Sequence, residues 1–228
     1  MDKLPQGKAK AALVEDMFDR IAPRYDLVNR LMTFRLDVRW RRKTVRALSL
    51  PKGSKILDLA CGTGDMCNDL LAAELSPIGV DFSQGMLGAS RTLASLVRAD
   101  VLCLPLAEGS IDGVTCGFAL RNFTDLDSFF QEMSRVVKPA GRIALLDVAQ
   151  PKSRILRTGH SLYFGKIVPL IGSALSDKSA YRYLPKSVSY LPPPSEMMQS
   201  LKNSGFSDAK RQLLSGGITQ MITATRDL

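Results

Sequence analysis

The chain has 228 residues, of which 45% are hydrophobic and 23% are charged, and these proportions predict one globular domain with a sizeable core. The net charge of +9 is uneven: residues 1–55 carry +8, residues 56–150 carry −6 and residues 151–228 carry +7. No apolar run approaches the ~20 residues that span a bilayer, and the first ten residues lack the apolar segment of a signal peptide, so we expect a cytoplasmic protein.

The first 54 residues are expected to be helical. Apolar spacing predicts helices over residues 11–20 and 27–32, broken at Pro23, and a basic helix over residues 38–48. The turn Pro51-Lys-Gly53 then leads into the main domain. We therefore predict a helical lid or substrate segment over residues 1–54 and an α/β domain over residues 55–228.

Strands and helices alternate through the main domain. Apolar runs predict strands over residues 55–61, 76–82, 96–102, 111–118 and 141–148. Amphipathic segments predict helices over residues 65–73, 84–94 and 126–137. Parallel strands joined by helix-length segments form a doubly wound, mostly parallel sheet, and this is the fold class that the sequence predicts.

The last third of the chain departs from this alternation. Residues 151–190 contain five aromatic side chains and are expected to form an insertion over the carboxyl edge of the sheet, where such folds bind ligands. Ser195 is predicted to cap a helix that runs to about Asn203. Residues 209–214 and 218–226 are predicted to form a hairpin, which gives the sheet an antiparallel C-terminal strand.

A glycine-containing loop follows the first strand, in the segment Asp58-Leu-Ala60-Cys-Gly62-Thr-Gly64-Asp65. Gly62 and Gly64 let the backbone approach a ligand, and the next helix presents free N–H groups. A dinucleotide-binding loop has Gly or Ala three residues after its second glycine, and this chain has Cys67 there, which disfavours NAD. One histidine, and four cysteines without a C-x-x-C pair, predict no metal site.

Two further carboxyl groups are predicted at the ends of the next strands. Asp81 lies 19 residues after Gly62 and is placed to accept two ribose hydroxyls, and Asp100 is placed to accept an adenine amino group. Acids at three successive strand ends repel phosphate and suit a positively charged nucleoside. The alternative is that Asp81 and Asp100 are turn residues at the strand ends.

With this loop and these acids, the chain resembles the class I methyltransferases that use S-adenosylmethionine (SAM). Further motifs are similar to those of the quinone C-methyltransferases of ubiquinone and menaquinone synthesis, and they cover the chain almost from end to end. These motifs are Phe18-Asp-Arg-Ile-Ala-Pro-Arg-Tyr-Asp-Leu-Val-Asn29, Leu120-Arg-Asn-Phe-Thr-Asp125, Arg135-Val-Val-Lys-Pro139, Tyr181-Arg-Tyr-Leu184 and Gly216-Gly-Ile218.

The resemblance implies a SAM site and an acceptor pocket. The predicted cofactor-binding residues are Asp58, Ala60, Gly62, Thr63, Gly64, Asp81, Phe82, Asp100, Val101 and Gly117. The predicted acceptor-binding residues are Tyr25, Asn29, Arg121, Asn122 and Tyr181.

The resemblance also implies methylation of a ring carbon in a prenylated quinol, which requires a phenolate and a proton acceptor. Arg121 is the candidate that stabilises the phenolate, and Asp65 or Tyr25 is the candidate that handles the proton. The alternatives are a structural salt bridge for Arg121 and core packing for Tyr25. The head group, naphthoquinol or benzoquinol, is left open.

Three other functions are the alternatives to this one. A methyltransferase for another small hydrophobic acceptor is favoured by two departures: Asp37 stands where the family has a histidine, and Thr219-Gln-Met-Ile222 lacks a second one. An RNA methyltransferase is favoured by charge alone, and without a recognisable RNA module no nucleic-acid partner is expected. A SAM-binding protein without catalysis is the third alternative. A homodimer is left open.

A prenylated quinol dissolves in the bilayer, so the sequence also predicts peripheral contact with an anionic membrane at its inner face. Trp40 lies among Arg39, Arg41 and Arg42, and a tryptophan beside basic residues is typical of an interfacial helix. The alternative is that Trp40 lies in the core and the arginines form a solvated face.

Overall fold

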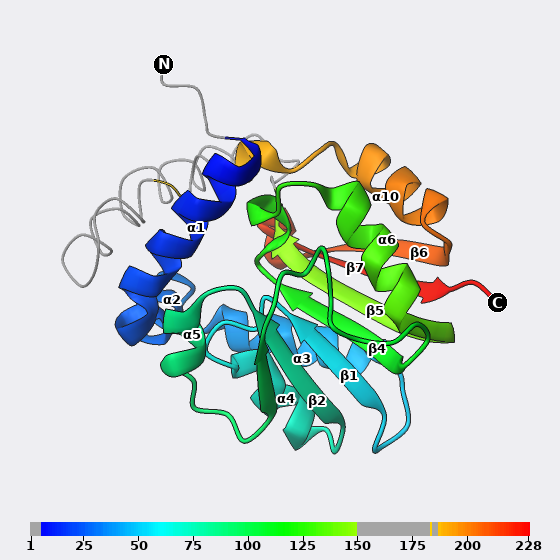
Figure 1. Ribbon diagram of the computed structural model, residues 1–228, viewed down its shortest axis with the longest axis horizontal. Helices are drawn as coiled ribbons and strands as arrows, with labels where there is room; N and C mark the ends of the chain where they lie inside the picture. The colour runs from blue at the N-terminus through cyan, green and yellow to red at the C-terminus, as the bar shows by residue number, and fades with distance from the viewer. Residues whose placement is uncertain (1–5, 150–182, 184–186) are drawn as a thin grey trace.

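The computed structural model describes residues 6–149, 183 and 187–228, and its centre is a seven-stranded sheet (Figure 1). The strand order is β3-β2-β1-β4-β5-β7-β6. Strands β1 to β5 pair in parallel, and β7 is antiparallel to both of its neighbours. The predicted fold class is thereby confirmed. The strands are β1 (Lys55–Leu59), β2 (Ser76–Asp81), β3 (Ser95–Arg98), β4 (Ile111–Gly117), β5 (Val137–Val148), β6 (Phe206–Leu214) and β7 (Thr219–Arg226).

Helices cover both faces of the sheet, and the alternating side chains of β5 show the two layers. Ile143 and Leu145 belong to the core on the face of α6 and α10, while Ala144 and Leu146 belong to the core on the face of α3 and α4. All four side chains are buried, so β5 is apolar without interruption over this stretch. These helices are α3 (Leu36–Leu48), α4 (Asp65–Ala72), α6 (Leu126–Val136) and α10 (Pro194–Asn203).

Two N-terminal helices, α1 (Gly7–Ile21) and α2 (Tyr25–Met32), lie beside the sheet rather than on its faces (Figure 1). A 3₁₀ turn containing Pro23 separates them, as the sequence predicts. They pack on the short helix α5 (Gln84–Gly88) through a cluster that includes Met17, Val28 and Met86. Helix α3 packs on the sheet, although it precedes the predicted domain boundary at residue 54, and that boundary stays a prediction.

The sheet changes its direction of growth at β1. Strands β2 and β3 extend it on one side, and β4 and β5 extend it on the other. In doubly wound folds a crevice opens beyond the carboxyl ends of the strands at such a point, and ligands bind there. The loops after β1, β2 and β4 therefore mark the candidate site.

Several predicted boundaries are wrong. The helix predicted over residues 84–94 ends at Gly88, because Gly85 and Gly88 weaken a short helix. Strand β3 ends at Arg98, so Asp100 lies in the following loop rather than at a strand end. Strand β5 begins at Val137 rather than at Gly141, because a residue that precedes proline favours the extended backbone.

The C-terminal hairpin forms as predicted, with a single 3₁₀ turn between β6 and β7. The predicted cap of α10 is wrong, since the helix begins at Pro194, where proline needs no hydrogen-bond partner for its nitrogen. Most of the predicted insertion, including Tyr181, lies outside the described residues. None of the helices in the described ranges has the length and apolarity needed to cross a bilayer.

Candidate functional site

A cleft opens at the carboxyl ends of β1, β2 and β4, under helix α1, and we call it the strand-end cleft. Most of its wall comes from the loop after β1, the end of β2, the loop after β3, and the residues from Gly117 to Thr124. The structure brings nine of the predicted site residues together in this wall. They are Tyr25, Ala60, Gly62, Asp81, Phe82, Asp100, Val101, Gly117 and Asn122.

The glycines of the loop after β1 have different roles. Gly62 has a φ of +57°, and a Cβ added to it would meet nothing within 4 Å, so its backbone is open to a ligand. Gly64 has a φ of +86°, and its Cβ would lie 2.6 Å from Cγ2 of Thr92. Gly64 is thus required by its backbone conformation and by packing, and its predicted contact with a ligand stays a prediction.

Asp81 holds the loop from the end of β2. Its Oδ2 accepts a 2.7 Å hydrogen bond from the Gly62 N–H, and its Oδ1 accepts a 2.8 Å hydrogen bond from the Ser83 N–H. Burial raises the pKa of this carboxyl group, while the backbone hydrogen bonds act in the opposite direction. A carboxylate has about four acceptor positions, so Asp81 keeps capacity for ligand hydroxyls beside these two N–H groups.

Asp58 lies beneath the cleft rather than in its wall. Its Oδ1 accepts a 2.8 Å hydrogen bond from the Thr115 hydroxyl, and its Oδ2 lies 3.4 Å from the Cys67 thiol. Burial raises the pKa of Asp58 to about 7. The described contacts of Asp58 therefore tie β1 to β4 and α4.

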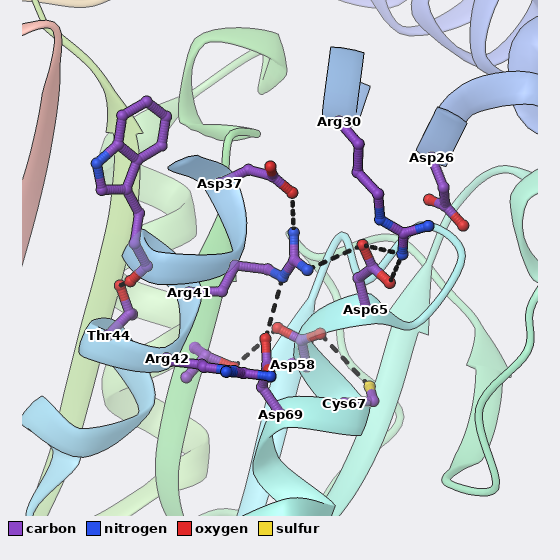
Figure 2. A network of polar contacts seen from close by, with 12 residues as sticks. Asp26, Arg30, Asp37, Arg41, Arg42, Thr44, Asp58, Asp65, Cys67 and Asp69 are labelled. Atoms are coloured by element: carbon purple, nitrogen blue, oxygen red, sulfur yellow. Dashed lines mark hydrogen bonds and ion pairs between the residues drawn. The ribbon is translucent and has the colours of Figure 1, made fainter. Parts of the chain in front are cut away.

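Helix α2 makes two polar contacts with the loop that follows β1 and with the first residue of α4. The Thr63 hydroxyl donates a 2.6 Å hydrogen bond to Oδ1 of Asp26, so it points to α2. Asp65 pairs with Arg30 of α2 at 3.0 Å and with Arg41 of α3 at 3.0 Å (Figure 2). Neither Thr63 nor Asp65 lines the strand-end cleft, and two guanidinium groups occupy the Asp65 carboxylate that was expected to handle a proton.

The predicted interfacial role of Trp40 is wrong. Its ring is only 7% exposed, lies 6.1 Å from the Phe118 ring centroid to centroid, and donates a 2.9 Å hydrogen bond from Nε1 to Ser215. The neighbouring Arg41 is also buried, among three carboxylates (Figure 2). These are Asp37 at 2.6 Å, Asp65 at 3.0 Å and Asp69 at 3.1 Å.

Arg121 forms a buried salt bridge with Asp147, which is the structural alternative to its predicted catalytic role. Its guanidinium donates to Oδ1 of Asp147 at 2.5 Å, to the Phe118 carbonyl at 2.6 Å and to the Ser187 hydroxyl at 3.1 Å. Arg121 is buried and does not line the strand-end cleft. Its role toward a phenolate stays a prediction.

The predicted acceptor residues are distributed unevenly. Tyr25 lines the cleft and packs edge-on against Phe18, with 6.0 Å between the ring centroids. Asn122 also lines it, and its Oδ1 accepts a 3.4 Å hydrogen bond from Tyr183. Asn29 is half-buried outside this wall, and its carbonyl accepts two hydrogen bonds from Thr33.

Residues of α1 were missed as site residues. Ala11, Val14 and Phe18 line the cleft, and Val14 and Phe18 also pack beside Met17 and Ile21 against the core around α5. The apolar residues of this helix form one broad stripe, which predicts packing but does not distinguish a core contact from a ligand contact. The sequence of α1 therefore contains no separate signal for the cleft.

The carboxyl groups in the wall of the strand-end cleft favour a positively charged ligand. Within the described residues, the wall contains the carboxyl groups of Glu15, Asp81 and Asp100, and neither a lysine nor an arginine. A phosphate or pyrophosphate would meet repulsion here. A nucleoside that carries a positive charge meets favourable charges and an apolar floor.

Comparison with known proteins agrees with this geometry. A sequence model described as the ubiE/COQ5 methyltransferase family matches residues 6–226. The chain belongs to this family. It is therefore a methyltransferase that uses SAM, as the sequence predicts.

The relatives cover nearly the whole chain. A demethylmenaquinone methyltransferase of Roseiflexus sp. (strain RS-1) is 41% identical over 98% of this chain and 97% of its own length. A ubiquinone/menaquinone biosynthesis C-methyltransferase of Syntrophotalea carbinolica is 39% identical over 93% of each chain. A demethylmenaquinone methyltransferase of Thermus thermophilus is 39% identical over 92% of this chain and 100% of its own length.

Solved structures agree on the fold. A SAM-dependent methyltransferase from Thermotoga maritima superposes with a TM-score of 0.65 at 17% identity, over 93% of this chain and 99% of that one. A Haemonchus contortus phosphoethanolamine N-methyltransferase in complex with SAM gives a TM-score of 0.61 at 14% identity, over 82% of this chain and 52% of that one.

Proposed function

We propose that this enzyme methylates a ring carbon of a demethylated prenylquinol, with demethylmenaquinol as the first candidate. The observation that carries the proposal is the strand-end cleft, which combines three carboxyl groups with an apolar wall under α1. The names of the relatives, at 41% and 39% identity over nearly the full chain, support the same substrate class.

The chain's own residues fit SAM in this cleft. When bound, SAM supplies an electrophilic methyl group on a sulfonium. Asp81 would accept the ribose hydroxyls, and Asp100 in the loop after β3 would lie toward the adenine. Gly62 and Gly117 line the cleft without side chains, so they would face the cofactor with backbone only.

The acceptor would enter along α1. Val14 and Phe18 provide an apolar face, and Tyr25 with Asn122 adds two polar side chains at the same wall. Such a mixture suits an aromatic ring that carries hydroxyl groups. Tyr25 remains the candidate that handles a proton, because Asp65 is held by Arg30 and Arg41.

Transfer of a labelled methyl group tests the function. We expect the purified enzyme with labelled SAM to methylate prenylquinol in reduced membranes from a strain that lacks quinone C-methylation. Bulk RNA and membranes from the complete strain serve as the comparison acceptors. Label in RNA, or none in the quinol fraction, would contradict the proposal.

We further propose that the enzyme collects its acceptor at an anionic membrane, with α2 rather than Trp40 making the contact. Leu27 and Leu31, four residues apart on α2, are 55% and 47% exposed, and Phe34 in the turn that follows α2 is 75% exposed. Arg35, which lies between Phe34 and the start of α3, is exposed, and so are Arg39 and Lys43 of α3. Apolar side chains beside basic ones are typical of a surface that binds anionic lipid.

Vesicle sedimentation tests this surface. We expect the wild type to pellet with anionic vesicles at low salt and not with neutral ones, because each basic residue contributes about 1 kcal/mol within a Debye length. A variant with Leu31→Gln and Phe34→Ser should pellet several-fold less. Leu93→Ser, a change at a 97% exposed apolar side chain outside α2 and the turn that follows it, is the control. Equal pelleting of both variants would remove this surface from the proposal.

A further inference from the structure

A second, larger hollow lies next to the strand-end cleft, and we call it the lateral hollow. It has a volume of about 690 Å³ and lies between the start of α1, the segment before α6, and α10. Phe123 and Thr124 line both the hollow and the cleft, so these two residues form their common wall. A volume of this size is that of a small-molecule site.

Lys10 lies at this common wall, on the same helix as the α1 residues of the strand-end cleft. Lys10 is only 4% exposed, and it lines the lateral hollow. Its Nζ donates a 2.6 Å hydrogen bond to the Phe123 carbonyl and lies 3.8 Å from the centre of the Tyr190 ring. The Phe123 carbonyl and the Tyr190 ring are both uncharged. The ammonium group lies over the face of the ring, where the attraction between a cation and a ring is strongest.

The charge of Lys10 is not neutralised within the described residues. Asp125, Asp127 and Glu196 line the same hollow, yet none of them forms an ion pair with Lys10. Asp125 instead caps α6, accepting hydrogen bonds from the N–H groups of Asp127 and Ser128. Burial without a counter-ion lowers the pKa of Lys10 to about 8.

A buried lysine without a carboxylate partner is costly for the fold, so a role in binding an anion accounts for its position. An ammonium group has three donors, and the Phe123 carbonyl uses one of them. The group could therefore donate to an oxygen that enters the hollow. The other candidate cation, Arg121, already donates to Asp147, to Phe118 and to Ser187.

We propose that Lys10 binds the ring oxygen of the acceptor and stabilises it as a phenolate, with the acceptor ring placed across the wall shared by the lateral hollow and the strand-end cleft. This inference rests on the proposed function, since it assigns the charge that a quinol needs in order to react at carbon. Lys10 replaces Arg121 in that role.

The proton balance is simple. The amine form of Lys10 takes the proton of the quinol hydroxyl, which leaves an ammonium–phenolate pair with no change in net charge. The ring carbon then forms its bond to the methyl group while the bond from sulfur to that methyl breaks, and the sulfonium becomes a neutral thioether. The ring carbon loses its proton through Tyr25 to solvent, and Lys10 returns a proton to the oxygen, so one proton is released in total.

A coloured phenol tests the binding role without any methyl transfer. The probe is 4-nitro-1-naphthol, whose phenolate form is read by its visible absorption when bound to the enzyme with S-adenosylhomocysteine present. An ammonium within hydrogen-bond reach lowers the pKa of a phenol by about one unit or more, a tenfold larger phenolate fraction. We expect this shift in the wild type and in Lys8→Met, a change at an exposed lysine two residues away, and not in Lys10→Met.

Stability and turnover complete the test. Lys10→Met should melt at the wild-type temperature or above it, because the change removes a buried charge that has no counter-ion, and it should bind SAM normally. Its methyl transfer to the quinol should fall at least about tenfold, the rate equivalent of one pKa unit. If Lys10→Met is too unstable to assay, Lys10→Gln replaces it, since glutamine still donates to Phe123.

The outcomes separate the two proposals. A wild type that methylates no quinol overturns the proposed function. A wild type that methylates quinol while Lys10→Met does so equally well overturns only the role of Lys10. An equal phenolate fraction in the wild type and in Lys10→Met, or no binding of the probe by the wild type, also overturns it.

Discussion

We expect Asp81→Asn to bind SAM at least about a hundredfold more weakly than the wild type does. The carboxylate accepts hydrogen bonds from the N–H groups of Gly62 and Ser83, and it would also accept the ribose hydroxyls. An amide presents an N–H₂ group to one of these N–H donors, so the loop loses a contact and the ligand loses a charged acceptor. Losing hydrogen bonds to a charged group costs roughly 1.5–3 kcal/mol each, and about 3 kcal/mol is a hundredfold in affinity.

Calorimetric titration with SAM measures the effect, and Asp112→Asn is the matched control. Asp112 undergoes the same chemical change, but it lies near the start of β4, where it pairs with Lys138 at 2.6 Å. The control should keep the affinity of the wild type. Unchanged affinity in a folded Asp81→Asn variant would mean that SAM does not use the acid at the end of β2, and the assignment of the strand-end cleft would be wrong.

The layered fold was predictable because its signals are local. Apolar runs of strand length and helices of periodic pattern depend on near neighbours in the chain, and they place the sheet and most of its helices correctly. The wrong boundaries of α5 and β5 also have local causes. Gly88 ends α5 early and Lys138 becomes extended before Pro139, and both reflect backbone preferences that a hydrophobic pattern does not contain.

The site was predictable only in part, because its polar partners come from distant parts of the sequence. Ala60, Gly62 and Asp81 follow directly from the ends of two strands, and they line the strand-end cleft as predicted, whereas Thr63, Gly64 and Asp65 of the same loop do not. The residues around Trp40 in the sequence predict an interfacial side chain. Its hydrogen-bond partner, Ser215, lies 175 residues later, so the local sequence does not indicate that the indole lies in the core. Lys10 has its contacts at Phe123 and Tyr190, and no pattern within α1 indicates them.

Arg121 also has partners from distant parts of the sequence, which no local pattern indicates. Among the changes considered, its replacement should give the largest loss of stability. We expect Arg121→Met to lower the free energy of unfolding by about 3–5 kcal/mol, because it leaves the fully buried Asp147 charged and without its partner. Denaturant unfolding measures the loss. Arg142→Met, at a half-buried arginine on β5 that forms a hydrogen bond to Thr225, should lose far less.

A double variant then separates stability from catalysis. Arg121→Met combined with Asp147→Leu removes both charges, and replacing a buried ion pair by apolar residues is often neutral for stability. We expect the double variant to recover most of the lost stability and, with it, turnover on the quinol. Recovered stability without turnover would instead assign the guanidinium to the phenolate, as the sequence predicted, and would leave Lys10 as the residue to reconsider. A double variant as unstable as Arg121→Met would show that the contacts of Arg121 with Phe118 and Ser187 outweigh its ion pair.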